Sequence, residues 1–120
     1  MVEEPSYHTL GSYQMEMLKG NNWMPWKMQM LAVLQDLSLK TYIDKDSKLP
    51  TPKDPQKPTD TEKEAEKKWC KGNAKARTHI ELTIGDSEMV HIIGATTASK
   101  MWKQLTPVKE SHGKLGILAM

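Results

Sequence analysis

Cys70 and His79 are the residues whose chemistry could form a catalytic pair, because a thiol beside an imidazole can act as an activated nucleophile. They are nine residues apart on one predicted helix, which separates them by about 13 Å along its axis. That distance excludes direct contact between the thiol and the imidazole. The sequence also contains neither a G-x-S-x-G motif nor a glycine-rich phosphate-binding motif. We therefore expect no catalytic residue and no enzyme activity.

Metal binding is also poorly supported by the spacing of potential ligands. The four histidines lack the regular spacing of zinc ligands, and one cysteine cannot form a zinc knuckle. The acidic residues from Glu62 to Glu66 are more simply a solvated helix face than a general acid and base. We therefore predict no metal, no cofactor and no small-molecule substrate.

Two groups of residues could contact nucleic acid. Trp23 and Trp26 could stack on bases, but their spacing continues into Met30, which favours a helix face buried in the core. The basic residues of the second long helix could contact phosphate, although interleaved glutamates favour a solvated face; they are Lys67, Lys68, Lys71, Lys75 and Arg77. The formal net charge of +2 is too small to imply nucleic-acid binding by itself. RNA is therefore a weakly supported partner.

Residues 86–105 present a second possibility for nucleic-acid binding, because a short helix, a turn and a further helix resemble a helix-turn-helix. The residues that would face a major groove are Ser99, Lys100, Lys103 and Gln104. Many helical hairpins that do not bind DNA share this turn. A small helix-turn-helix-like nucleic-acid-binding module is therefore the alternative function.

The best-defined helix is predicted from Trp23 to about Leu37, with Asn22 as N-cap. One apolar stripe of this helix should face the core, and a second strip lies beside it, formed by Met24, Met28 and Leu31. This strip is either buried beneath an extended segment at Tyr13–Met17 or exposed as a self-association surface. We take it as the candidate self-association surface.

Helix-capping residues, prolines and the periodicity of apolar residues predict the remaining helices and loops. Residues 1–12 should be flexible, a short helical turn should cover 39–43, and a Pro/Lys/Asp-rich segment at 44–61 should form a long exposed loop. A second long helix should begin near Glu62 with Asp60 or Thr61 as N-cap, and Gly94 should end a short helix that Asp86 caps. The last helix should begin at Thr96 or Thr97, and Pro107 should end or kink it.

These elements predict an all-α fold, a small bundle of four or five helices forming one domain at residues 13–119. The 120 residues suit a single small domain. The predicted core consists of Trp23, Trp26, Met30, Leu34, Trp69, Ile80, Met101, Trp102 and Leu105. The lone cysteine fits a reducing compartment, and the sequence has no secretory signal or membrane-spanning apolar run. We therefore expect a cytoplasmic protein without membrane contact.

Four blocks in order resemble the Gag protein of copia-type LTR retrotransposons. The string LKGNNWMPWKMQMLAVLQDLSLKTYI, at residues 18–43, is similar to the N-terminal signature of that family. The charged helix with Trp69, Ala76 and Ile80 is similar to the next block. TTASKMWKQL (96–105) and VKESHGKLGILA (108–119) resemble the two that follow. Each block alone is weakly specific, whereas four in the right order are more so.

The resemblance implies an all-α, capsid-like structural protein without enzyme activity. It implies that the chain acts by association with itself or with other Gag chains, in particles that package the RNA of the element. Because the sequence stops at Met120, before further capsid helices of the family, it also suggests a truncated or host-adopted copy.

Overall fold

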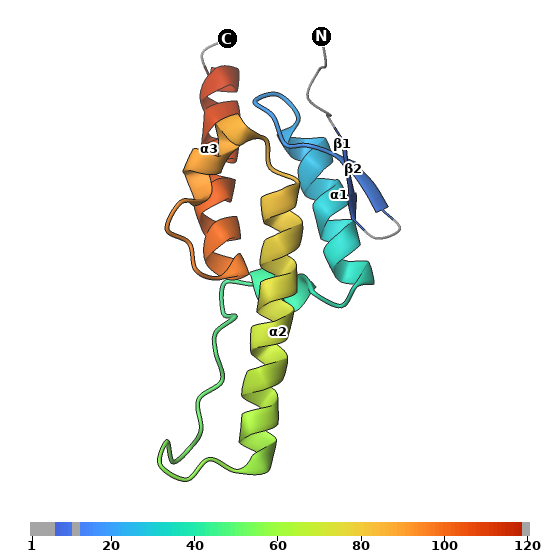
Figure 1. Ribbon diagram of the computed structural model, residues 1–120. Helices are drawn as coiled ribbons and strands as arrows, with labels where there is room; N and C mark the ends of the chain where they lie inside the picture. Colours follow the sequence, from blue (N-terminus) through green and yellow to red (C-terminus); the bar gives the residue numbers. More distant parts are fainter. Residues whose placement is uncertain (1–6, 11–12, 119–120) are drawn as a thin grey trace.

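The computed structural model describes residues 7–10 and 13–118, with side chains described for residues 13–111. The elements follow the order β1 (Tyr7–Leu10), β2 (Tyr13–Glu16), α1 (Trp23–Asp36), η1 (Lys40–Ile43), α2 (Asp60–Leu82), η2 (Asp86–Ile92) and α3 (Ala98–Leu118), where η marks a 3₁₀ helix. The predicted all-α bundle is confirmed, with three α-helices and two 3₁₀ helices in the described part of the chain. In Figure 1 the lower half of α2 and the loop that precedes it extend beyond the bundle.

The two strands form an antiparallel hairpin beside α1, in which Tyr7 pairs with Glu16 and Leu10 with Tyr13. Strand β2 matches the predicted extended segment. Strand β1 falls in the segment expected to be flexible and was not predicted, because its period-2 signal is too short to stand alone. Residues 1–6 and 11–12 of that segment lie outside the described residues.

Helix α1 starts after Asn22 as predicted, but the Asn22 side chain does not cap it. Its Oδ1 accepts a hydrogen bond from the Lys19 backbone N–H at 2.6 Å, and its Nδ2 donates to the Met17 carbonyl at 2.9 Å. The amide therefore closes the turn that leads from β2 into the helix.

Helix α2 is capped by Thr59, so the predicted caps Asp60 and Thr61 are wrong by one or two residues. The Glu62 backbone N–H donates to Thr59 Oγ1 at 3.1 Å, and the Thr59 N–H donates to the Glu62 carboxylate at 2.8 Å. This reciprocal pair is a capping box. The same carboxylate accepts a bond from the Lys53 N–H at 2.8 Å, which ties the proline-rich loop to the helix.

These backbone N–H donors lower the pKa of the Glu62 carboxyl group. The Thr59 N–H has the larger effect and the Lys53 N–H the smaller. A lowered folded-state pKa stabilises the protein above the unfolded-state pKa, and this contribution disappears as the pH falls through the folded-state value. Glu62→Gln should therefore lower the melting temperature at pH 7, and the difference from the wild type should vanish in acid. Melting curves from pH 7 downwards test this, and a difference that persists unchanged into acid would contradict it.

Helix α3 begins as predicted, since Thr97 Oγ1 accepts a bond from the Lys100 N–H at 3.1 Å. Gly94 has a φ of 86°, in the left-handed region expected of a residue that ends a helix. Pro107 was predicted to end or kink this helix; the predicted end is wrong, because α3 continues through Pro107 to Leu118. Leu105 and Lys109, on either side of the proline, are anchored by buried contacts, so tertiary packing holds the helix where one backbone bond is missing.

Seven of the nine predicted core residues are buried in one cluster: Trp23, Trp26, Met30, Leu34, Ile80, Met101 and Leu105. Trp102 is half-buried against this cluster. Trp69 is also half-buried, but it packs against the ring of Tyr42 at 6.4 Å and its Nε1 donates to Ser47 Oγ. Placing it in the main core was wrong, because its ring packs on Tyr42 and Ser47 and does not join the buried cluster.

Candidate self-association surface

The predicted strip on α1 lies mostly in solvent. Met24 is 55% exposed and Met28 66% exposed, whereas Leu31 is half-buried against the core. Strand β2 instead lies beside a neighbouring face of α1, where Tyr13 and Met15 share a shallow hollow with Val33. Burial beneath the extended segment is therefore wrong for both methionines.

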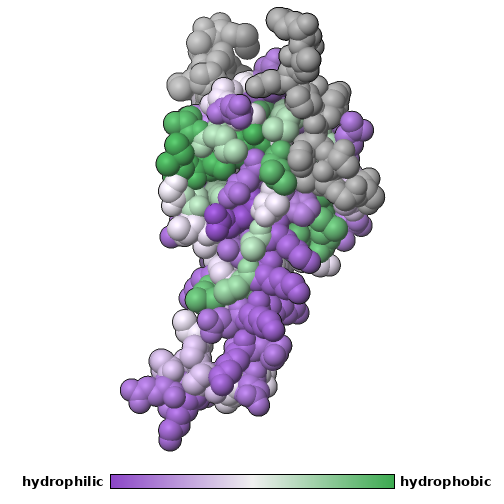
Figure 2. All heavy atoms as spheres, viewed as in Figure 1, coloured by the Kyte–Doolittle hydropathy of each residue, from purple (hydrophilic) through white to green (hydrophobic). Residues whose placement is uncertain are grey.

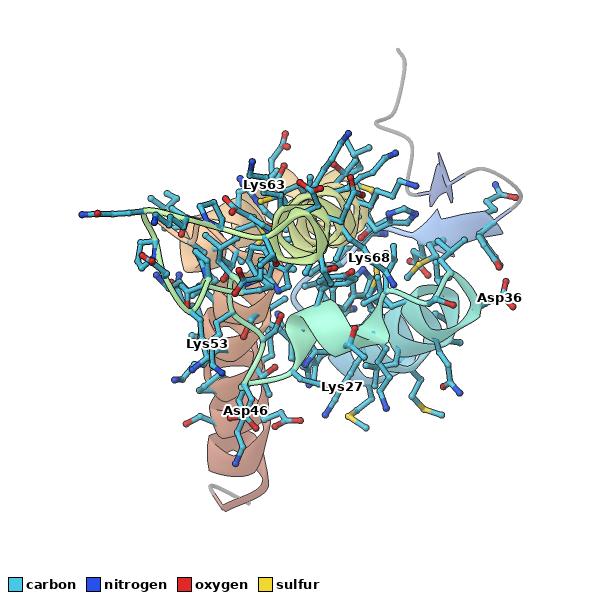
Figure 3. The ribbon with its side chains drawn as sticks, turned by 90° about the horizontal axis from the view of Figure 1, so that it is seen from below. Lys27, Asp36, Asp46, Lys53, Lys63 and Lys68 are labelled. Carbon is cyan, nitrogen blue, oxygen red and sulfur yellow. The ribbon has the colours of Figure 1, made fainter. Side chains whose placement is uncertain are left out.

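Tryptophan rings fill the space between α1 and α3. Trp26 and Trp102 have ring centroids 5.8 Å apart, and Trp23 lies 6.1 Å from Trp102. Lys27 Nζ lies 5.8 Å from the Trp23 ring and forms an ion pair with Glu110 at 2.7 Å. Figure 3 shows Lys27 on the side of α1 that is turned away from α2. The junction of α1 and α3 is therefore rigid and open to that side.

A hollow of about 280 Å³ lies between η1 and α3. Its apolar lining includes Ile43, Trp102 and Pro107, and two lysines, Lys45 and Lys103, also line it. None of the described residues that line it is acidic. Pockets for drug-sized ligands hold about 300–1,000 Å³, so this hollow suits one or two side chains of a protein partner.

An ion pair joins the helix of the methionine strip to α3 one turn beyond the hollow. Pro107 lines the hollow, and Glu110, one turn further along α3, bonds to Lys27 on α1. Met24 and Leu31 lie one turn before and after Lys27 on α1. We call this combined surface the α1–α3 groove; it comprises Met24, Met28, Leu31, Ile43, Trp102 and Pro107.

Part of the polar lining of the groove has no partner within the protein. Among the described side chains, the buried Thr106 hydroxyl has no hydrogen-bond partner. Pro107 also lacks the N–H that would bond to the Lys103 carbonyl in a regular helix. Buried polar atoms are usually paired, so the Thr106 hydroxyl is an exception among the described side chains.

A second apolar surface, which the sequence analysis missed, lies on η2. A 3₁₀ helix has about three residues per turn, so residues three apart share one row. Glu88 and Ile92 are the buried residues of η2, whereas Val90 is 62% exposed and Ile93, which directly follows η2, is 72% exposed. We call Val90 and Ile93 the η2 ridge. Figure 2 shows hydrophobic atoms gathered at the upper left, where η2 lies in Figure 1.

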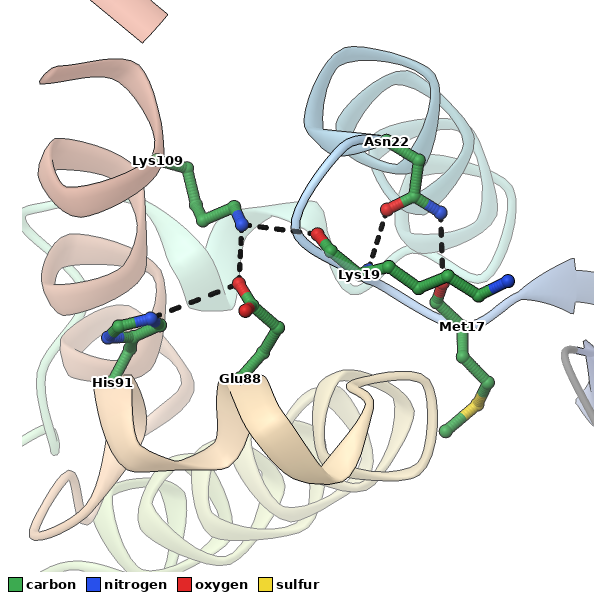
Figure 4. A network of polar contacts seen from close by, with 6 residues as sticks. All are labelled: Met17, Lys19, Asn22, Glu88, His91 and Lys109. Carbon is green, nitrogen blue, oxygen red and sulfur yellow. Dashed lines mark hydrogen bonds and ion pairs between the residues drawn. The ribbon is translucent and has the colours of Figure 1, made fainter. Parts of the chain in front are cut away.

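A buried polar network fixes the position of η2 (Figure 4). Glu88 of η2 forms a short ion pair with Lys109 of α3. Lys109 Nζ also donates to the Lys19 carbonyl at 3.1 Å, in the turn that Asn22 closes. The His91 Nε2 lies 3.9 Å from the Glu88 carboxylate. The network joins η2, α3 and the turn before α1.

A model of the gag polypeptide of copia-type LTR elements matches residues 30–116, more than half of the chain. The chain belongs to this family. No curated protein and no solved structure matches it significantly. The match includes the Thr96–Leu105 block and all of α2, whereas the first part of the N-terminal block lies outside it. Gag polypeptides are structural, non-catalytic retrotransposon proteins.

The residues considered for nucleic-acid contact are largely engaged inside this Gag chain. Ser99 Oγ donates to the Asp44 carbonyl at 2.8 Å, and the Gln104 amide donates to the His91 and Ile93 carbonyls. Trp23 and Trp26 are buried, so they cannot stack on bases. Two of the four residues that would face a major groove, Ser99 and Gln104, therefore already form hydrogen bonds within the chain. This disfavours the helix-turn-helix alternative.

The lysines of α2 remain on the surface of the Gag chain. Lys67, Lys68 and Lys71 surround a shallow hollow together with Glu64. Figure 3 shows Lys63 and Lys68 on α2, seen end-on. Arg77 forms an ion pair with Glu81 at 3.3 Å. The mixture of signs is that of a solvated helix face rather than a dedicated phosphate site.

The residues considered for catalysis lie apart on the surface of α2. Cys70 is exposed, and His79 Nδ1 contacts the Lys75 carbonyl at 2.8 Å. Among the described residues, no group of three histidine, cysteine or acidic side chains is placed to hold a metal ion. No helix in the described part of the chain is long and apolar enough to cross a membrane.

Proposed function

We propose that this Gag chain is a structural protein that acts by self-association through the α1–α3 groove. The proposal rests on the exposure of Met24 and Met28 on α1, together with the apolar hollow between η1 and α3. Methionine suits such a contact, because its flexible thioether adapts to the surface of a partner and packs well on aromatic rings. The tryptophan rings hold the groove in shape before binding, which lowers the entropic cost of association.

The family supports a role as a structural component that contacts other Gag chains. The groove is small compared with the roughly 800 Å² per partner of stable pairwise complexes. We expect each contact to be weak and assembly to depend on several contacts formed together.

Met28→Asp should abolish concentration-dependent association, because a carboxylate at the centre of the strip would have to be desolvated in the interface. Sedimentation velocity from micromolar to high micromolar concentration measures this. The matched control is Leu49→Asp, which changes an exposed leucine to aspartate in the proline-rich loop, away from the groove. A monomeric wild type, or equal association of the wild type and Met28→Asp, would reject the proposal.

Other Gag chains are the partners this function requires, and the cytoplasm is the compartment we propose. The exposed thiol of Cys70 supports a reducing environment. RNA is a further proposed partner, through the exposed lysines of α2. Binding by these lysines would weaken steeply with salt, and filter binding at low salt that detects no RNA would remove this partner.

A further inference from the structure

The η2 ridge and the α1–α3 groove lie on opposite sides of α3. Gln104 faces η2, since its amide bonds to two η2-region carbonyls, whereas Thr106 lines the hollow of the groove. Residues two apart on an α-helix point about 200° away from each other. One copy of the chain can therefore use its ridge and its groove at the same time.

The two surfaces are complementary in shape. The ridge presents two adjacent branched side chains, Val90 and Ile93, which are among the most exposed large hydrophobic residues described. The hollow, about 280 Å³ in volume, suits one or two such side chains. Burying one or two such side chains removes only a small apolar area from water, so the fit supports a weak but specific contact.

The two surfaces are also complementary in charge. Lys45 and Lys103 line the hollow, and both are exposed. Asp86 is exposed at the start of η2, four residues before Val90. A ridge seated in the hollow would bring the Asp86 carboxylate towards the lysines. The opposite charges would attract the two copies and set their relative orientation.

The polar network holds the ridge in a defined position. Glu88 joins η2 to Lys109, and the Gln104 amide holds the carbonyls of His91 and Ile93. The backbone of the ridge is thus fixed before any partner arrives. A prearranged ridge loses little entropy on docking, as a specific contact surface requires.

We infer that the η2 ridge of one copy docks into the α1–α3 groove of a second copy. This inference rests on the proposed self-association and names the partner surface of the same groove. The contact is heterologous, because two different surfaces meet, and it therefore propagates into rings or open chains rather than stopping at a symmetric dimer.

Mixing two variants tests the pairing. Met28→Asp blocks the groove and leaves the ridge intact, whereas Ile93→Asp blocks the ridge and leaves the groove intact. In sedimentation velocity the wild type should form species larger than dimers, and each variant alone should remain monomeric. An equimolar mixture should form a one-to-one dimer and nothing larger, because one intact ridge meets one intact groove.

The outcomes separate this inference from the proposed function. A wild type that stays monomeric rejects self-association itself. A wild type that associates, with Met28→Asp monomeric but Ile93→Asp associating like the wild type, leaves the proposed function standing and overturns the pairing with η2. A mixture of two monomeric variants that forms no dimer also overturns it.

A charge exchange provides a test that leaves the apolar residues intact. Asp86→Lys and Lys103→Glu both alter exposed side chains, so the fold should be retained. Each alone should weaken association about tenfold, and the chain carrying both should recover most of the loss. Additive losses in the double variant would show that the two residues do not meet, and would overturn the inference.

Discussion

Lys109→Met is expected to lower the free energy of unfolding by about 3–5 kcal/mol, because it leaves the Glu88 carboxylate buried without its cation. Glu88 is only 7% exposed, so water cannot replace the lost ammonium group. The substitution also removes the bond from Lys109 Nζ to the Lys19 carbonyl. Urea unfolding of the wild type and the variant at pH 7 measures the difference.

Two further variants show whether burial of the charge is the cause. The Glu88→Met and Lys109→Met double variant should regain part of the stability, since it removes the unpaired charge as well as its partner. Lys27→Met breaks the more exposed pair with Glu110 and should cost about 1 kcal/mol or less. Equal losses for Lys27→Met and Lys109→Met would contradict the assigned role of burial.

The parts of the fold that were predictable from the sequence are those governed by local rules. The periodicity of Trp23, Trp26 and Met30 predicts the buried face of α1, because residues on one side of a helix recur every three or four positions. Thr97 and Gly94 follow capping rules that depend only on neighbouring backbone groups. The candidate residues Met24 and Met28 were likewise found from periodicity.

The features that were missed depend on contacts between distant residues. Pro107 is a helix breaker by local rules, but buried neighbours on either side of it hold α3 together. Glu88 and Lys109 are separated by 21 residues, and nothing in their local sequence marks them as partners. Trp69 has the periodicity of a core residue, yet it is only half-buried and packs against Tyr42 outside the buried cluster. Tertiary packing decides each of these cases.

The η2 ridge was missed for a different reason. Four apolar residues within Met89–Ile93 suggest burial, but of these only Ile92 is buried, while Met89, Val90 and Ile93 are exposed. The choice between α and 3₁₀ geometry determines which side chains are exposed. Only the structure shows that Val90 and Ile93 are exposed.

Trp26→Ala should lower the free energy of unfolding by about 3–5 kcal/mol, because it removes a fully buried ring from the junction of the helices. The ring packs against those of Trp23 and Trp102, with centroids 5.7 Å and 5.8 Å away. Its Nε1 also donates to the Thr83 carbonyl at the end of α2. Thermal and urea unfolding measure the loss, and Trp69→Ala, which removes a half-buried tryptophan, should lose less.

Trp26→Phe distinguishes the contribution of the aromatic ring from that of the Nε1 hydrogen bond. Phenylalanine retains an aromatic ring but lacks the N–H, so the Thr83 carbonyl keeps only its bond from the Leu18 N–H at 2.7 Å. The expected cost is about 1–3 kcal/mol for the lost bond and the smaller ring, below that of Trp26→Ala. The same ring supports Trp102 in the groove, so Trp26→Ala should also weaken self-association at temperatures where the variant remains folded. Unchanged association in a destabilised but folded variant would show that the groove keeps its shape without this ring.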